Sequence, residues 1–140
     1  MEQYIKNIFG NNIQNFIIHD DNIKYYGCEF EYQNKYICFR KCKVTQKKPG
    51  FFVTLWKKIN NINTPYNIYD KYHIYIFYIE TKNNKGIFKF PKSVLINNGI
   101  LQNNLNKGKM GFRIYAPWNN KLNNTAINTQ QWQSQFYTKL

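Results

Sequence analysis

Arg40-Lys-Cys-Lys-Val-Thr-Gln-Lys-Lys-Pro-Gly-Phe-Phe-Val-Thr-Leu-Trp-Lys-Lys58 joins a dense run of cations to an apolar run through a Pro49-Gly50 turn. In the apolar part, residues 51–58, large side chains fall on both of the faces that an alternating strand presents. This pattern predicts a strand that is buried on both faces. Cations next to a rigid apolar element indicate a site for an anion.

Short helices and strands are expected on both sides of this stretch. Apolar residues at helical spacing predict helices at residues 2–9, 91–95 and 125–139, the last with Asn124 as its N-cap. Apolar runs bounded by turn residues predict strands at residues 28–32, 36–44, 73–80, 87–90 and 112–115. Residues 13–18 fit either state, and polar loops are expected at residues 59–70 and 101–110.

This order of elements predicts the fold class. The 140 residues are enough for one domain with its own core, and nothing in the composition divides them. A helix, a run of strands, and then helix, strand and helix are typical of the α+β class. We therefore expect a single domain, residues 1–140, with a mixed, mostly antiparallel central sheet flanked by helices.

The distribution of charge points to a polyanionic partner. The formal net charge is +13, and the chain has only seven acidic residues. None of them lies in residues 32–69 or 81–140, so part of the surface carries a strongly positive field. Such a field attracts nucleic acid, an anionic membrane surface or an acidic protein partner. The alternative is a charge that serves solubility alone.

The cysteines and the N-terminal sequence indicate the cellular compartment in which the protein resides. Cys28, Cys38 and Cys42 form no Cys-x-x-Cys pair, and only two histidines are present, which argues against a structural zinc site. Buried thiols in a reducing compartment are the simpler interpretation. No signal-peptide core and no run long enough to span or insert into a bilayer is seen, so we expect a cytoplasmic protein.

Several motifs then resemble one family along nearly the whole chain. They are Arg40 to Trp56 of the quoted stretch, Gly86-Ile-Phe-Lys-Phe-Pro-Lys-Ser-Val-Leu95, Gly99-Ile100, Gly108-Lys-Met-Gly-Phe-Arg-Ile-Tyr115, Pro117-Trp118 and Thr129-Gln-Gln-Trp-Gln133. In this order they resemble the MepB-like proteins. The resemblance implies a fold similar to the endonuclease-like α/β core, and a likeness of fold does not establish cleavage.

The sequence departs from the family pattern at three places. Gln46 stands where family members usually carry Pro, and Asp21-Asn22 stands near their Glu-Ser. His73 lies where they tend to place an acidic residue. If these positions form an active site in relatives, the resemblance implies that the site is altered or silent in this chain.

A metal-dependent nuclease needs two or more carboxylates for Mg²⁺ or Mn²⁺ and often a lysine at the developing charge. Asp21 together with Glu29 or Glu31 is one candidate set. Glu80-Thr-Lys82 is another, because strand alternation would point both charged side chains to one face. The alternative interpretation is that these acids offset nearby lysines on a solvated surface.

A basic cluster is the stronger candidate for a site. Its cations lie in the family motifs but on different elements: Arg40, Lys43, Lys48, Lys92, Lys109 and Arg113. Brought together, they would bind phosphate through arginine forks and lysine point charges, and Trp118 could stack on bases. Otherwise they are separate surface cations and Trp118 belongs to the core.

The sequence thus predicts a nucleic-acid-binding domain of nuclease-like fold, with metal-dependent phosphodiester cleavage as an additional hypothesis. Two other functions remain open from the residues. One is a non-catalytic binding module or complex subunit that docks on an acidic partner, and the other is a pocket for a small anion.

Overall fold

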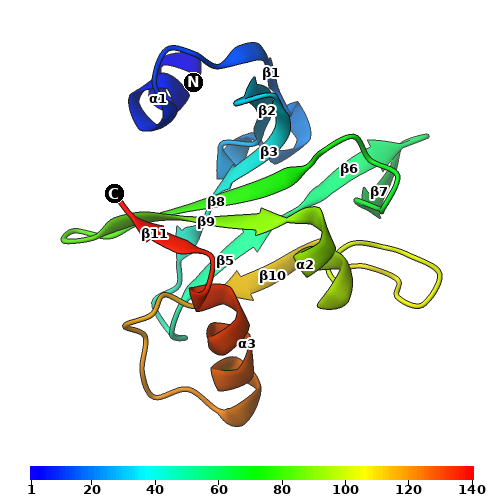
Figure 1. Ribbon diagram of the computed structural model, residues 1–140. Coiled ribbons are helices and arrows are strands. Elements are labelled where there is room, and N and C mark those ends of the chain that lie inside the picture. Colours follow the sequence, from blue (N-terminus) through cyan, green and yellow to red (C-terminus); the bar gives the residue numbers. More distant parts are fainter.

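The computed structural model describes residues 1–140 as an α+β fold with three sheets (Figure 1). The largest sheet has six strands in the order β1-β2-β3-β8-β9-β11. Their bounds are β1 Gln14–Ile18, β2 Cys28–Tyr32, β3 Lys35–Lys41, β8 Ile74–Glu80, β9 Lys85–Pro91 and β11 Tyr137–Lys139. Only β3 and β8 run parallel, and every other neighbouring pair is antiparallel. The predicted mixed, mostly antiparallel sheet is confirmed.

Two smaller sheets lie beside the large one. The first has three strands in the order β10-β5-β4, and the second pairs β6 with β7. Their bounds are β4 Lys43–Val44, β5 Phe51–Thr54, β6 Trp56–Ile59, β7 Ile62–Pro65 and β10 Gly111–Ile114. The chain leaves the large sheet at Cys42, whose N–H donates to the carbonyl of Tyr78 at 2.9 Å. Residues 40–58 therefore contribute to all three sheets.

Helices cover the large sheet on both of its faces (Figure 1). They are α1 Glu2–Phe9, α2 Lys92–Asn97 and α3 Asn124–Ser134, with a 3₁₀-helix η1 at Asp20–Tyr25. The fully buried Ile5 of α1 joins one apolar cluster with Phe30 and Phe39. The other cluster packs Phe77 and Phe90 of the large sheet against the three-stranded sheet, α2 and α3. Each face of the large sheet thus has its own core.

The strand expected at residues 51–58 is wrong in two respects. It is broken at Leu55, whose N–H donates to the carbonyl of Met110 at 2.8 Å, so β5 and β6 enter different sheets. Only one of its faces is buried, with Phe51, Val53 and Leu55 in the core and Phe52 and Thr54 half-buried on the other face. This outer face is only partly covered, and the short η1 lies against β5.

Other expectations fail where tertiary pairing overrides local pattern. The loop expected at residues 59–70 contains β7, which forms a hairpin with β6. The last helix ends at Ser134 instead of Lys139, because residues 137–139 pair with β9 at the edge of the large sheet. Asn123, not Asn124, caps α3 by accepting the N–H of Ala126 at 2.9 Å. The helix expected at residues 2–9 is confirmed.

The three cysteines are free and buried, as the sequence predicted. No helix is long and apolar enough to cross a membrane.

Candidate functional site

A row of outward-facing side chains crosses the three-stranded sheet. Phe52 of β5 is in register with Lys43 of β4 on one side and with Arg113 of β10 on the other. Residues in register point to the same face of a sheet, so the two cations flank the half-buried ring of Phe52. The ammonium of Lys43 lies 4.5 Å from the ring centroid of Tyr25 in η1. Two cations therefore lie on the outer face of the three-stranded sheet, which the core does not cover.

Arg113 also holds the loop that precedes β5. Its Nη2 donates to Oγ1 of Thr45 at 2.5 Å and to the carbonyl of Pro49 at 2.7 Å. Gly50 closes this loop with φ +83°, and a Cβ there would meet the carbonyl of Ile114 at 2.7 Å. Only glycine fits such a position without displacing its neighbours. The loop that carries Lys47 and Lys48 is therefore fixed to the sheet.

Shallow grooves surround the fixed loop. One of about 410 Å³ lies between Lys48, Arg113 and Lys121. A second of about 410 Å³ is lined by Lys47, Lys48, Lys121 and the 42% exposed Trp118. No acidic side chain lines either groove. A third cavity, of about 420 Å³, brings Lys109 to Arg113 and also lacks acids.

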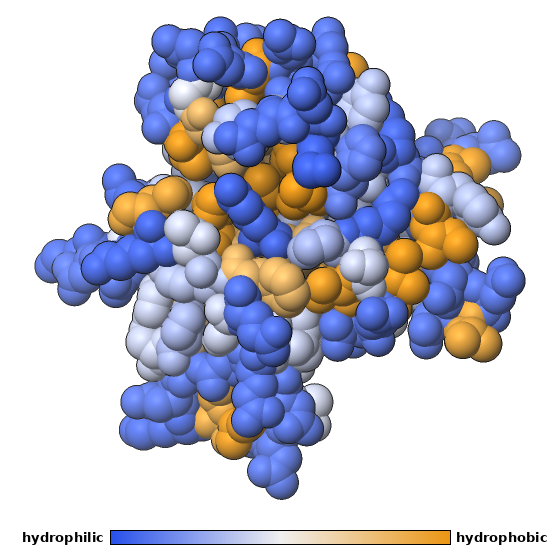
Figure 2. Space-filling model, viewed as in Figure 1, coloured by the Kyte–Doolittle hydropathy of each residue, from blue (hydrophilic) through white to orange (hydrophobic).

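We call this surface the basic face and define it by its six cations, Lys43, Lys47, Lys48, Lys109, Arg113 and Lys121. Near it, α3 and the adjoining loop form a predominantly hydrophilic surface at the bottom of the view (Figure 2). Four of the six cations expected at one site lie here. Lys47 and Lys121 were missed because neither was singled out within the motifs. The absence of acids after residue 80 was the signal that could have found Lys121.

The structure places the other two expected cations elsewhere. Arg40 is fully buried in the large sheet, with no exposed area. The ammonium of Lys92 donates to two backbone carbonyls, that of Ile68 at 3.0 Å and that of Asp70. Both side chains thus hold the fold together, and neither belongs to the basic face.

A separate cleft of about 550 Å³ opens between η1, β6 and the segment 66–72. Three tyrosines line it, Tyr66, Tyr69 and Tyr72, and we call it the tyrosine cleft. Its rim carries Asp20, Asp21 and Asp70 together with Lys57, Lys58 and Lys71. This size is within the range of about 300–1,000 Å³ typical of small-ligand sites.

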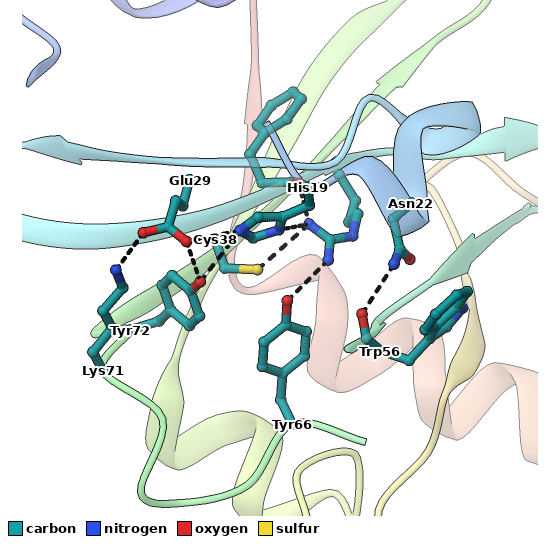
Figure 3. A network of polar contacts seen from close by, with 10 residues as sticks. His19, Asn22, Glu29, Cys38, Trp56, Tyr66, Lys71 and Tyr72 are labelled. Atoms are coloured by element: carbon teal, nitrogen blue, oxygen red, sulfur yellow. Dashed lines mark hydrogen bonds and ion pairs between the residues drawn. The ribbon is translucent and has the colours of Figure 1, made fainter. Parts of the chain in front are cut away.

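Arg40 is the centre of a polar network. The network includes four residues that line the cleft, and Figure 3 labels all of them: His19, Tyr66, Lys71 and Tyr72. Nη1 of Arg40 donates to Nδ1 of His19 at 3.0 Å and to the carbonyl of Phe39 at 2.8 Å. Nη2 donates to the hydroxyl of Tyr66 at 3.2 Å. A guanidinium donates and does not accept, so Nδ1 of His19 is an acceptor and the imidazole proton lies on Nε2. That proton is donated to Oε1 of Glu29 at 2.9 Å.

The same carboxylate receives two further partners. The hydroxyl of Tyr72 donates to Oε1 of Glu29 at 2.7 Å, and Lys71 pairs with Oε2. Burial and then the charge of Arg40 lower the pKa of His19, against the opposing effect of Glu29. Burial raises the pKa of Glu29, but Lys71, His19 and Tyr72 lower it more. A neutral imidazole therefore bridges a buried cation and a carboxylate, and neither ring nitrogen is free to act as a base.

The candidate catalytic acids are distributed over the molecule. Glu29 is part of the network just described, whereas Asp21 lies 3.9 Å from Lys58 at the rim of the cleft. Glu80 ends β8 and pairs with Lys41 at 3.5 Å and Lys85 at 3.7 Å.

Lys82 follows Glu80 in the turn after β8, so strand alternation does not relate the two side chains. Glu31 accepts a hydrogen bond from Asn15 instead of joining Asp21. No group of three His, Cys, Asp or Glu residues could hold a metal ion.

Comparison with known proteins agrees with this architecture. The structure defines the class of protein, an α+β fold with a mixed six-stranded sheet and a basic loop fixed to a smaller antiparallel sheet. The model of the MepB-like family matches residues 19–139. The chain belongs to the MepB-like family. The crystal structure of MepB is similar over 99% of this chain and 95% of its own, with 33% sequence identity and a TM-score of 0.89. The curated proteins contain no match.

Proposed function

We propose that this protein binds nucleic acid through the basic face. The observation that carries the proposal is that Lys47, Lys48, Arg113 and Lys121 line adjoining grooves without any acidic side chain. Lysines and arginines fixed near each other neutralise successive backbone phosphates, and the counterions that they release drive binding. Five of the seven acids already face a lysine within 4 Å, so little negative charge is left to cancel the basic face.

The position of Trp118 favours binding of single-stranded nucleic acid to the basic face. Its indole lies in the groove with Lys47, Lys48 and Lys121, and 42% of its area remains exposed. One edge packs on the ring of Tyr137 with centroids 6.0 Å apart. Base stacking on an aromatic ring beside phosphate-binding cations is the usual arrangement of single-strand binding surfaces. An exposed aromatic thus adds an apolar contact to the electrostatic one.

We do not extend the proposal to cleavage that depends on Mg²⁺ or Mn²⁺. Asp21, Glu29 and Glu80 each face a different lysine, and a two-carboxylate metal site needs ligands that converge. Incubation of a labelled oligonucleotide with the protein and either metal tests this directly. Degradation that Asp21→Ala abolishes would restore the nuclease hypothesis.

Binding is tested by titrating a fluorescent oligonucleotide at several salt concentrations. We expect affinity to fall steeply with salt, and replacing Lys47, Lys48 and Lys121 by Gln to reduce the logarithmic salt slope by about 2–3. A matched control replaces the exposed Lys35, Lys89 and Lys139, which line none of the grooves on the basic face, and therefore removes the same charge from elsewhere. Equal loss in both triple variants would mean that only net charge matters.

The absence of binding at low salt would remove the nucleic-acid proposal. Binding of the basic face to an acidic protein would then be the remaining explanation for its charge. We further propose the cytoplasm as the location, since three buried free thiols suit a reducing compartment.

A further inference from the structure

The loop on one side of the tyrosine cleft is firmly held although its central residue is exposed. Tyr69 is 84% exposed, and among the large hydrophobic side chains only Leu105 is more exposed. Its own N–H donates to Oδ1 of Asn67 at 2.8 Å, and the N–H of Asn67 donates to Oδ2 of Asp70 at 2.7 Å. The ammonium of Lys92 donates to the carbonyls of Ile68 and Asp70.

The same loop is also fixed to the segment that follows α2. The N–H of Ile68 donates to the carbonyl of Gln102 at 3.2 Å. The ring of Tyr69 is therefore presented to solvent by a backbone that is already ordered. An aromatic side chain in this state loses little conformational entropy when a ligand packs on it. Lys92, expected from the sequence to bind an anion, acts as the clamp of this loop.

The rim around this ring has charged groups that the protein leaves available. Asp20 has no hydrogen-bond or ion-pair partner within the chain, in contrast to Asp70, which pairs with Lys57. Asp21 and Lys58 are about half exposed, and 3.9 Å separates their charged atoms. The neighbouring Asn22 has both ends of its amide occupied, by Trp56 and Thr54. Carboxylate acceptors and one loosely paired ammonium thus stand beside an aromatic ring.

These groups together define the chemistry of a ligand. A flat ring would stack on Tyr69, an amino group would donate to Asp20, and an anion would bind Lys58 in place of its distant partner. Nucleotides whose base carries an exocyclic amine combine all three features, and carboxylates accept such amines in base recognition. The cleft volume of about 550 Å³ accommodates a ligand of this size.

We propose that the tyrosine cleft binds one amine-bearing nucleotide, either free or as part of a strand. The inference does not require the basic face to bind nucleic acid, because the residues of the tyrosine cleft belong to a different part of the surface. The two sites adjoin through η1, which places Asp20 and Asp21 at the cleft and Tyr25 beneath Lys43. A single strand could therefore reach both.

The first experiment titrates ¹⁵N-labelled protein with AMP, CMP and UMP and follows backbone amide shifts. AMP and CMP should shift residues 20–22, 56–58 and 66–72, and UMP, which lacks the exocyclic amine, should bind more weakly. Tyr69→Ala should weaken binding about 5- to 150-fold, the range expected for loss of one stacking contact. Asp20→Asn should remove the preference for AMP and CMP over UMP. Leu105→Ala, at a comparably exposed side chain that does not line the cleft, is the matched control.

The same variants are then tested with single-stranded oligomers of dA and dT at high salt. If the dependence on Tyr69 and Asp20 is found with mononucleotides, the ligand is a free nucleotide. If it is found only with the oligomers, the cleft receives one nucleotide of a strand. Equal binding of UMP and AMP, or shifts confined to the basic face, would overturn the inference while leaving the proposed function intact.

Discussion

Nη1 of Arg40 lies 3.0 Å from Nδ1 of His19, and this contact fixes the tautomer of the imidazole. It also determines how stability responds to pH. Burial and the charge of Arg40 lower the pKa of His19 from its ordinary 6.5, so the unfolded chain binds a proton that the folded chain resists.

We therefore expect the free energy of unfolding to be greatest above pH 6.5 and to decrease as pH falls through the folded pKa of His19. Urea denaturation at about pH 5 and pH 8 measures this change. His19→Asn should flatten the dependence over that window. Glu29, whose pKa is lowered from 4.5, contributes its own loss of stability only at lower pH. An unchanged dependence in His19→Asn would mean that folding does not shift the pKa of His19.

Replacement of Arg40 separates a structural role from an anion-binding one. Arg40→Ala removes the four hydrogen bonds of the guanidinium, takes away the donor to His19 and Tyr66, and opens a cavity in the core. We expect a loss of about 3–5 kcal/mol of unfolding free energy in urea denaturation. Arg40→Lys should be nearly as damaging, since an ammonium cannot reproduce the planar fork. A stable Arg40→Ala variant with impaired ligand binding would contradict this assignment.

Gly86 is predicted to control the attachment of the C-terminal strand. A Cβ at this position would overlap the ring of Tyr137, which packs directly above it in β11. Gly86→Ala should cost about 1–3 kcal/mol and release β11, and amide hydrogen exchange at residues 86–88 reports that release. The double variant with Tyr137→Ala should recover most of the protection. If Gly86→Ala lowers the free energy of unfolding equally with and without the ring of Tyr137, the cost arises from the backbone at residue 86.

Arg113→Lys tests whether the basic loop must be fixed in order to bind. The charge is kept, but a lysine cannot hold Thr45 and Pro49 at once through one planar group. We expect oligonucleotide affinity to fall about 5- to 10-fold while the salt slope stays the same, because no phosphate contact is lost. Fluorescence titration measures both quantities. A change in slope without a change in loop order would mean that lysine at position 113 does not reach the phosphate that Arg113 contacts.

The fold class followed from local pattern, whereas the division into three sheets did not. Residues 51–58 read as one strand because both faces carry large side chains, and the pattern contains no signal for the break at Leu55. That break depends on a hydrogen bond to Met110, which is distant in the sequence. Residues 137–139 became a strand for a related reason, since only the edge of β9 offers them partners.

The candidate site was predicted in part. The family motifs and the scarcity of acids selected Lys43, Lys48, Lys109 and Arg113, which the structure places on one surface. Burial of Arg40 was not foreseeable, since arginine is normally an exposed residue and its partners come from segments far apart in the chain. The tyrosine cleft is invisible in the sequence because its walls meet only through tertiary packing.

The passage of the chain from the large sheet to the small one takes a single residue, Cys42. Lys41 closes β3 and Lys43 opens β4, where it is in register with Phe52. Inserting or deleting one residue here would reverse which side chains face outward and turn Lys43 toward the core. Individual lysines of the basic face can therefore be exchanged with little effect on folding, whereas a change in the length of this passage would alter which side chains the small sheet exposes.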